Sequence, residues 1–515
     1  MFTKIFSAAN SGLETIKVDV EVNLANRGLP GFEIVGLPDK AVEESKERVR
    51  AAITSSGVEF PNKKITVNLA PADIPKEGSF YDLPIALGIL SAVFRFSLPE
   101  ESLFFGELSL DGSLRHTKGA FLLGLFAKEK QFKNLFVPKD SANEAAVVSG
   151  VKVYPIKSLS QLVSYFLKRT EIEPAIYKEK KGGADNRAEF DMKEILGQEQ
   201  AKRAMEIAAA GGHNIIMVGS PGSGKTMLAR ALPGILPPLN EEESLEVTKL
   251  YSAAGCIPPG GSLITTRPFR APHHTASPVG LIGGGTKPHP GEVSLAHMGV
   301  LFLDEFNEFP RSVMEAMRQP LEDGYLTISR SKEKVKYPAD FMLVASANPC
   351  PCGYLNHPKK QCVCTPRQIR NYQKRISGPI LDRIDLHINI EPVELDKFSE
   401  NQKASQFLEP SSKIRERVIA SRERQKRRFK EESLQTNSQM RNRHIKKYCQ
   451  LSKEVENLLK QASMKFQLSA RSYIKMIKVA RTVADLEGSE QISVSHMAEA
   501  LQYRPKIYEM LEKTI

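Results

Sequence analysis

The chain lacks the residues and segments that define several protein classes. Its six cysteines are too few to hold 515 residues together by disulfides. No apolar run reaches the ~18–20 residues that span a bilayer, and the longest, residues 83–98, contains Arg95. The start of the chain has no long apolar run followed by a cleavage site, so we expect no signal peptide. We found no internal repeat. These absences favour a cytoplasmic protein without a membrane partner.

The composition fits an ordinary globular protein. Hydrophobic residues make up 41% of the chain and charged residues 26%, which excludes a mainly disordered protein. At roughly 100–200 residues per domain, about three domains are expected. Lys and Arg outnumber Asp and Glu by 72 to 60, a net charge of +12. This surplus favours polyanionic partners, nucleic acid first.

Four segments differ in their patterns. The first mixes short alternating strands with helices, and the second is charged without an apolar face, which indicates a linker. The third alternates apolar strands with helices, which indicates a parallel sheet. The fourth is helical and basic. In chain order the segments span residues 1–170, 171–190, 191–395 and 396–515.

A glycine-rich stretch between a predicted strand and a predicted helix fits the phosphate-loop pattern G-x-x-x-x-G-K-[ST]. Its glycines let backbone amides surround phosphate oxygens. Lys225 is placed to reach the β- and γ-phosphates, and Thr226 to ligate Mg²⁺. The motif consists of Gly219, Ser220, Pro221, Gly222, Ser223, Gly224, Lys225 and Thr226. It predicts a nucleoside triphosphate site.

Two further apolar strands end in polar residues. The strand over residues 300–303 ends in Asp304 and Glu305, which we expect to hold Mg²⁺ and to activate the attacking water, respectively. The strand over residues 341–347 ends in Asn348, whose amide can orient that water. The alternatives are an ordinary strand end and a turn cap.

Together these three strands resemble the AAA+ ATPases. Ile195 and Leu196, which precede Gly197 and Gln198, resemble the entry to that module beside the adenine. The stretches RPFRAPHH and PGEVSLAH resemble the magnesium-chelatase-like branch. With the first segment, these motifs resemble the ComM/YifB family over nearly the whole chain.

The stretches PKEGSFYDLP, at residues 75–84, and GELSLDG, at residues 106–112, resemble the Lon-protease fold. The pattern of that family puts its serine nucleophile at Phe80 and its lysine near Phe121, while Ser79 and Lys118 are displaced. We therefore expect no peptidase chemistry. The resemblance implies an α/β chain with a Lon-like α+β domain, an AAA+ parallel-sheet core with helices on both faces, and a C-terminal helical lid.

AAA+ subunits form rings, usually hexamers, in which an arginine of one subunit completes the next site. Arg383 matches this arginine finger, and Arg375 is the second candidate. A surface arginine paired with Asp382 or Asp385 is the alternative for Arg383. Arg471 resembles the lid arginine that senses the γ-phosphate, with an ordinary helix-start arginine as its alternative.

Two elements resemble the pore loops of ring motors. One contains three glycines at residues 283–285, and the other is a predicted hairpin over residues 326–337 with a basic tip. We expect the tip to contact a DNA backbone, with a solvated hairpin as the alternative. The candidate residues are Arg330, Lys332 and Lys334. Residues 413–430 contain nine Lys or Arg and form either a solvated connector or a further nucleic-acid contact.

Four cysteines follow Asn348 in the spacing C-x-C-x₉-C-x-C. Four thiolates on a short hairpin can close a tetrahedral Zn²⁺ site, although C-x-C is tighter than the usual spacing. Free thiols or a redox pair are the alternatives. The four residues are Cys350, Cys352, Cys362 and Cys364.

The resemblance implies a homohexameric DNA motor that binds ATP and Mg²⁺. We expect a helicase that drives branch migration during natural transformation, with recombination proteins as partners. The alternative is a magnesium-chelatase-type subunit that remodels a protein partner. Phe80 argues against a peptidase, and the filled ATPase positions argue against a non-hydrolysing scaffold.

Overall fold

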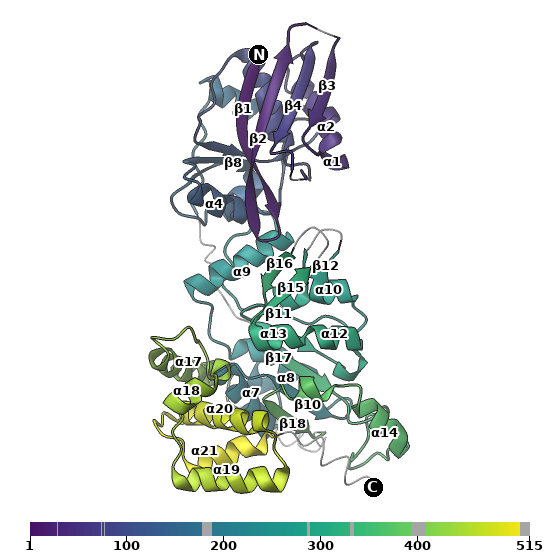
Figure 1. Ribbon diagram of the computed structural model, residues 1–515, viewed down its shortest axis with the longest axis vertical. Helices are drawn as coiled ribbons and strands as arrows, with labels where there is room; N and C mark the ends of the chain where they lie inside the picture. Colours follow the sequence, from purple (N-terminus) through teal and green to yellow (C-terminus); the bar gives the residue numbers. More distant parts are fainter. Residues whose placement is uncertain are drawn as a thin grey trace. The chain divides into compact units, whose positions relative to one another are not determined.

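The computed structural model describes residues 1–27, 29–73, 75–76, 78–177, 188–285, 289–329, 334–392 and 408–504. The chain forms two compact units (Figure 1). Unit 1 comprises Met1–Gly183 and Glu241–Ile264, and unit 2 comprises Ala184–Asn240 and Thr265–Ile515. The boundary between the units lies between residues 183 and 184, and residues 178–187 of the linker expected at 171–190 lie outside the described residues.

Unit 1 is built on a mixed sheet with the strand order β3-β4-β2-β1-β5-β8-β9. The pairs β1–β2 and β2–β4 are antiparallel, and the other neighbours are parallel. Its strands are β1 (Phe2–Ser11), β2 (Glu14–Ala25), β3 (Gly31–Val35), β4 (Lys64–Ala70), β5 (Ser102–Phe104), β8 (Asn134–Pro138) and β9 (Lys152–Ile156), with a separate ribbon of β6 (Glu107–Leu108) and β7 (Leu114–Arg115).

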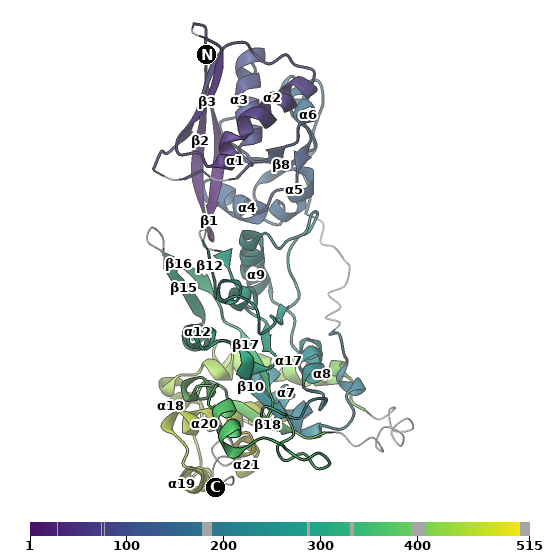
Figure 2. The same cartoon turned by 90° about the vertical axis from the view of Figure 1, so that its right-hand side faces the viewer.

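Buried and partly exposed residues alternate along the strands of unit 1, and the buried ones form its core. In β2, Val18, Val20 and Val22 are fully buried, while the residues between them are partly exposed. The buried helix α3 packs on β1 and β2, and Figure 2 shows α1, α2 and α3 on one side of these strands. The helices of the first segment are α1 (Lys40–Glu43), α2 (Ser45–Ser55), α3 (Asp82–Phe94), α4 (Ala120–Glu129), α5 (Lys139–Ala145) and α6 (Leu159–Phe166).

One helix of unit 1 comes from much later in the chain. Helix α9 (Glu241–Ala254) packs on α4, and the buried Glu144 carboxylate accepts hydrogen bonds from Ser252 Oγ at 2.6 Å and Phe121 N at 3.0 Å. Burial raises the pKa of Glu144. The sequence pattern placed residues 241–264 within the third segment, because periodicity shows that a helix has an apolar face but not which domain covers it.

Unit 2 is built on a parallel sheet with the strand order β11-β14-β17-β10-β18. Strands β14 and β17 are buried at every position, as expected of strands covered on both faces. The strands expected over residues 215–218, 300–303 and 341–347 are confirmed to within one residue. The strands are β10 (Ile215–Gly219), β11 (Phe269–Arg270), β14 (Val300–Leu303), β17 (Met342–Ala347) and β18 (Leu386–Ile390), with two ribbons formed by β12 (Gly283–Gly284) and β13 (His289–Pro290) and by β15 (Tyr325–Ser329) and β16 (Lys334–Pro338).

Helices complete unit 2. Helix α7 packs on β18 and is itself contacted by α17 and α20. The helices are α7 (Glu199–Gly211), α8 (Lys225–Ala231), α10 (Pro278–Ile282), α11 (Glu292–Leu295), α12 (Arg311–Ala316), α13 (Arg318–Asp323), α14 (Pro366–Gln373), α15 (Gly378–Leu381), α17 (Ser411–Arg428), α18 (Asn442–Tyr448), α19 (Lys453–Phe466), α20 (Ala470–Glu487) and α21 (Val494–Gln502). The expected fold class, α/β with a parallel-sheet core and a C-terminal helical region, is confirmed. Across the described residues, every helix is too short or too polar to cross a bilayer.

Candidate nucleotide-binding site

The phosphate loop, the acidic pair Asp304–Glu305 and Asn348 meet at one edge of the unit 2 sheet. They directly follow the carboxyl ends of β10, β14 and β17. Strand β17 lies between the other two and runs parallel to both. Ligand sites of open parallel sheets lie at this carboxyl edge.

The phosphate loop has the shape of a cradle. Gly222 and Gly224 have φ angles of +77° and +91°, and a Cβ added at either would meet no atom within 4 Å. The buried hydroxyls of Ser220 and Ser223 have no hydrogen-bond partner among the described residues. Phosphate oxygens can accept hydrogen bonds from these hydroxyls, and the loop leads into the amino end of α8, so it fits a triphosphate.

Lys225 links the loop to the neighbouring strand. Its ammonium donates to the carbonyl oxygens of Gly219 at 2.8 Å and Ser220 at 2.9 Å, and to Asn348 Oδ1 at 3.4 Å. Burial lowers its pKa, against the attraction of Asp304. The ammonium of Lys225 can replace one of these neutral oxygens by a charged phosphate oxygen. The new hydrogen bond is then charge-assisted and stronger.

Asp304 is held from three directions. Thr226 Oγ1 donates to its Oδ2 at 3.0 Å, the amide of Glu305 donates to its Oδ1 at 3.0 Å, and Ser346 Oγ also donates to Oδ1. One hydroxyl and one carboxylate side by side are oxygen ligands that suit Mg²⁺. Sequence reasoning missed Ser346, although it lies on β17 two residues before Asn348, a spacing that places two side chains on the same face of an extended segment.

Glu305 has an unusual backbone and a close partner. It lies in the left-handed region at φ +53°, and its Oε2 lies 3.1 Å from His274 Nδ1. A non-glycine residue there costs on the order of 1 kcal/mol and is a signal of function. His274 follows the edge strand β11, so its contact with Glu305 could not be read from spacing.

The entry segment lies beside the phosphate loop. Ile195 is buried in the core of unit 2 and Leu196 is partly exposed. Gln198 Nε2 donates to the carbonyl oxygens of Glu391 at 2.5 Å and Ser223 at 3.5 Å. These contacts bring the segment against both the loop and the end of β18.

The two candidate arginines share one carboxylate. Arg383 Nη2 lies 2.7 Å from Glu322 Oε1, and Arg471 Nη2 donates to the same oxygen. The hydrogen bond from Arg383, and then Arg471, lowers the pKa of Glu322. Arg375 instead pairs with Glu308 at 2.6 Å, close to the end of β14. Sequence reasoning missed Glu322, which lies far from both arginines in the chain.

This arginine pair lies at the amino edge of the sheet. The carbonyl oxygen of Arg383 accepts from Asn214 Nδ2 at 3.1 Å, and Asn214 is the residue before β10. The phosphate loop begins at the other end of β10, which is about 17 Å away for five residues. An arginine side chain is much shorter than this, so neither guanidinium reaches the phosphate loop of its own chain.

The expected basic hairpin is present as β15 and β16, which pair from Tyr325↔Pro338 to Ser329↔Lys334. Lys334 is exposed, and Lys336 Nζ lies 3.5 Å from the ring centre of Tyr325. The other two candidates for DNA contact, Arg330 and Lys332, lie outside the described residues.

Most arginines of the basic helix α17 are used inside unit 2. Arg415 donates to Gly234 O at 2.7 Å, Arg422 to Ala209 O at 2.8 Å, and Arg428 pairs with Asp485. The lysines and arginines of this stretch that remain exposed are Lys413, Lys426, Arg427 and Lys430. The structure therefore favours the connector over an extended nucleic-acid contact.

The four clustered cysteines lie together. Their sulfur atoms are all within 4.8 Å of one another, which is compatible with a structural Zn²⁺. The backbone amide of Tyr354 lowers the pKa of Cys352 to about 6. The other two cysteines are isolated, with Cys256 exposed and Cys449 buried.

The peptidase positions of unit 1 are occupied by aromatic packing. The Phe80 ring stacks on Phe105 at 4.3 Å between centroids, and Phe121 is fully buried. Ser79 Oγ donates to Glu107, whereas Lys118 is exposed.

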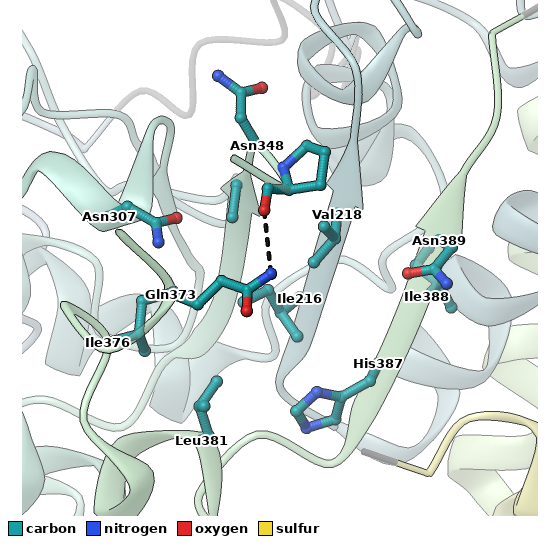
Figure 3. A pocket seen from close by; sticks show the side chains of 12 residues that line it. Ile216, Val218, Asn307, Asn348, Gln373, Ile376, Leu381, His387, Ile388 and Asn389 are labelled. Atoms are coloured by element: carbon teal, nitrogen blue, oxygen red, sulfur yellow. Dashed lines mark hydrogen bonds between the residues drawn. The ribbon is translucent and has the colours of Figure 1, made fainter. Parts of the chain in front are cut away.

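A small cavity beside Asn348 is lined by residues of β10, β17 and β18 on one side, and by Asn307, Gln373, Ile376 and Leu381 on the other (Figure 3). His387 lines it, and burial lowers the pKa of His387 to about 4. The His387 imidazole therefore binds a proton less tightly in the folded state than in the unfolded state, where its pKa is about 6.5. The contribution of His387 to the free energy of unfolding is fully present above pH 6.5 and is lost as the pH falls toward 4.

We expect His387→Gln to reduce this acid sensitivity. The depressed pKa corresponds to a loss of roughly 3 kcal/mol between pH 6.5 and 4. Urea unfolding at pH 7 and pH 4.5 would measure the difference, with His289→Gln as an exposed control. An equal pH dependence in His387→Gln and the wild type would contradict the assignment.

Comparisons with known proteins show the family of the chain. Three family patterns match: "Magnesium chelatase, subunit ChlI" over residues 191–398, "Subunit ChlI of Mg-chelatase" over 20–141, and "Magnesium chelatase, subunit ChlI C-terminal" over 408–504. The chain is 41% identical over 504 residues to protein YifB of Salmonella typhimurium, covering 97% of this chain and 96% of that protein.

Two other relatives bear on function. The chain is 41% identical to competence protein ComM of Haemophilus influenzae over 516 residues, covering 98% of this chain and 97% of that protein. It is 28% identical to the magnesium-chelatase 38 kDa subunit of Rhodobacter capsulatus over 185 residues, 32% of this chain and 52% of that protein. The family implies ATPase activity with ATP and Mg²⁺. With full-length identity at this level, the chain belongs to the ComM/YifB family of magnesium-chelatase-like AAA+ proteins.

Proposed function

We propose that this protein is an ATP-driven DNA motor that works as a ring of identical subunits, six in most AAA+ proteins, and promotes branch migration during recombination of incoming DNA. One observation carries the motor part of the proposal. The groups that bind and hydrolyse ATP lie at one edge of the sheet, and the arginine pair lies at the other.

This separation requires a neighbouring subunit. Arg383 and Arg471 cannot reach the phosphate loop of their own chain across the length of β10. In a ring, the amino edge of one sheet faces the carboxyl edge of the next, and both guanidiniums then stabilise charge on the transferred phosphoryl group. Arg375 pairs with Glu308, which follows β14 at the carboxyl edge, so it fits this role less well.

Residues of the same chain divide the remaining work. Lys225 and the loop amides bind the phosphates, and Thr226 and Asp304 would hold Mg²⁺, which neutralises phosphate charge when bound. Glu305 takes a proton from the attacking water once it leaves His274, and Asn348 orients that water from the adjacent strand.

The positive charge of the chain and its similarity to a competence protein support DNA as the substrate. The chain has a net charge of +12, the β15–β16 hairpin presents the exposed Lys334, and a full-length relative is a competence protein. The deciding test is ATP hydrolysis and strand separation by the purified protein on branched DNA. We expect hydrolysis to rise with DNA and unwinding to require ATP.

We expect the double variant Lys332→Ala, Lys334→Ala to lose most of the DNA stimulation and to keep basal hydrolysis. The physical reason is that two phosphate contacts are removed from each subunit while the nucleotide site is untouched. Lys460→Ala, which removes an exposed lysine paired with Glu456 on α19, is the control. Equal loss of basal and stimulated rates would refute the pore assignment.

The second candidate is a magnesium-chelatase-type subunit that remodels a protein partner, favoured by the similarity to the 38 kDa subunit of Rhodobacter capsulatus. That similarity covers 32% of the chain, against 98% for the competence protein. Hydrolysis that no form of DNA changes, but that a protein partner raises, would favour this candidate.

A further inference from the structure

The cysteine cluster forms a short loop between β17 and α14, which we call the cysteine loop (residues 350–364). The Sγ atom of Cys350 lies 3.4 Å from that of Cys352 and 3.7 Å from that of Cys362, and Cys352 and Cys362 are 3.5 Å apart. A disulfide needs about 2.05 Å. Sulfurs bound to one Zn²⁺ at about 2.3 Å lie roughly 3.8 Å apart in a tetrahedron, so the spacing fits a shared metal.

The donor set limits the choice of metal. Among the described residues, the cluster consists of four thiols, with no carboxylate or imidazole ligand. Soft sulfur ligands in a tetrahedral arrangement suit Zn²⁺ or iron, and Zn²⁺ is the metal that closed four-cysteine structural sites hold. Four protein ligands leave no position open for water or substrate, so the metal would be structural.

The cysteine loop is attached to the nucleotide site at its beginning and its end. Cys350 follows Asn348 by two residues, and α14 begins at Pro366, two residues after Cys364. Gln373 at the end of α14 donates through Nε2 to the carbonyl oxygen of Pro349 at 3.1 Å (Figure 3). Movement of the loop therefore acts directly on the backbone that carries Asn348.

The cysteine loop also touches the phosphate loop. Gly353 follows Cys352, and its amide donates to the carbonyl oxygen of Cys350 at 2.9 Å, which closes a tight turn. A Cβ added at Gly353 would lie 2.5 Å from Cδ and 2.8 Å from Cγ of Pro221. The turn that carries two of the thiols is thus packed against the phosphate loop without room for a methyl group.

We propose that the four cysteines bind Zn²⁺ and that the bound metal holds Pro221 and Asn348 where ATP binding and hydrolysis require them. The metal closes the cysteine loop, and the closed turn supports one side of the phosphate cradle. Without the metal, the turn loses the cross-link that joins its thiols to Cys362 and Cys364. The inference rests on the proposed ATPase site and adds a metal on which that site depends.

The first experiment counts the metal. Full-length protein purified without added chelator should contain about one zinc per chain by elemental analysis, as four thiolates imply. The double variant Cys352→Ser, Cys364→Ser should lose it, and Cys256→Ser, which removes an exposed cysteine outside the cluster, should keep it. Zinc-free protein from zinc-supplemented cells would overturn the proposal.

The second experiment tests the contact and keeps the metal in place. Gly353→Ala should retain zinc but lower ATP turnover or ATP affinity by at least about tenfold, because its Cβ displaces Pro221 by an appreciable fraction of an ångström. Adding Pro221→Ala removes Cγ and Cδ and should restore part of the loss. Gly150→Ala has a similar φ of +97° but nothing within 4 Å, so it controls for backbone strain.

The outcomes separate the two levels of the proposal. Wild-type protein without ATPase activity would refute the proposed function, while the zinc count would still decide the metal site. Active wild-type protein whose ATP affinity and turnover are unchanged by zinc removal and by Gly353→Ala would refute only the coupling. Because Gly353→Ala keeps the thiols, it decides the question even if zinc-free protein fails to fold.

Discussion

Glu305→Gln is expected to lower the rate of ATP hydrolysis by about 10²–10⁴-fold, the contribution of a positioned general base, while ATP still binds. The amide keeps the shape of the carboxylate but cannot accept a proton from water. Lys225, Thr226 and Asp304 are unchanged in this variant, so phosphate and Mg²⁺ binding should persist. Phosphate release gives the rate, and titration with a fluorescent ATP analogue gives the affinity.

Glu315→Gln is the matched control for this substitution. Glu315 is exposed on α12 and pairs with Arg318 at 2.7 Å, so its replacement should leave hydrolysis unchanged. A rate for Glu305→Gln within a few-fold of the wild type would show that another group activates the water. A loss of ATP affinity equal to the loss of rate would instead assign Glu305 to binding.

Arg383→Ala is expected to lower hydrolysis by about 10³-fold or more, because arginine fingers contribute 10³–10⁵ in rate. The effect should depend on the neighbouring subunit, since Arg383 lies at the opposite sheet edge from Lys225. Mixing Arg383→Ala chains with Lys225→Ala chains, each inactive alone, should restore part of the activity. Some interfaces of the mixed ring then join an intact phosphate loop to an intact arginine.

Arg375→Ala separates the two finger candidates. Arg375 pairs with Glu308 after β14, and its loss should be tolerated far better than that of Arg383. The reverse order of effects would exchange the two assignments. Absence of any recovery in mixed assemblies, with both variants shown to exchange subunits, would contradict action across a subunit boundary.

The arginine pair is also tied to the C-terminal helices. Lys475, one turn after Arg471 on α20, lies 3.4 Å from Asp385, which follows Arg383 by two residues. Asp385 also contacts His213 at 3.1 Å, and the charge of Lys475 helps to hold the pKa of Asp385 below its usual range. These contacts connect the segment that carries Arg383 to the helix that carries Arg471.

Most of the candidate site was predicted from motifs whose residues are contiguous in the sequence. The phosphate loop, Asp304 with Glu305, and Asn348 could be placed from the sequence because each directly follows an apolar strand, and parallel strands bring their carboxyl ends to one edge. The β15–β16 hairpin followed from alternation alone. In each case the residues that define the feature are neighbours in the chain, so local pattern contains the information.

Tertiary structure alone decided the contacts between distant segments. Glu322 and Arg471 are 149 residues apart, yet one oxygen of Glu322 serves both arginines. Nothing in local periodicity indicates that Gly353 touches Pro221, that His274 meets Glu305, or that α9 packs in unit 1. Periodicity shows which face of a helix or strand is apolar. Which element covers that face depends on the packing of the whole domain, in which alternative contacts between residues far apart in the sequence compete.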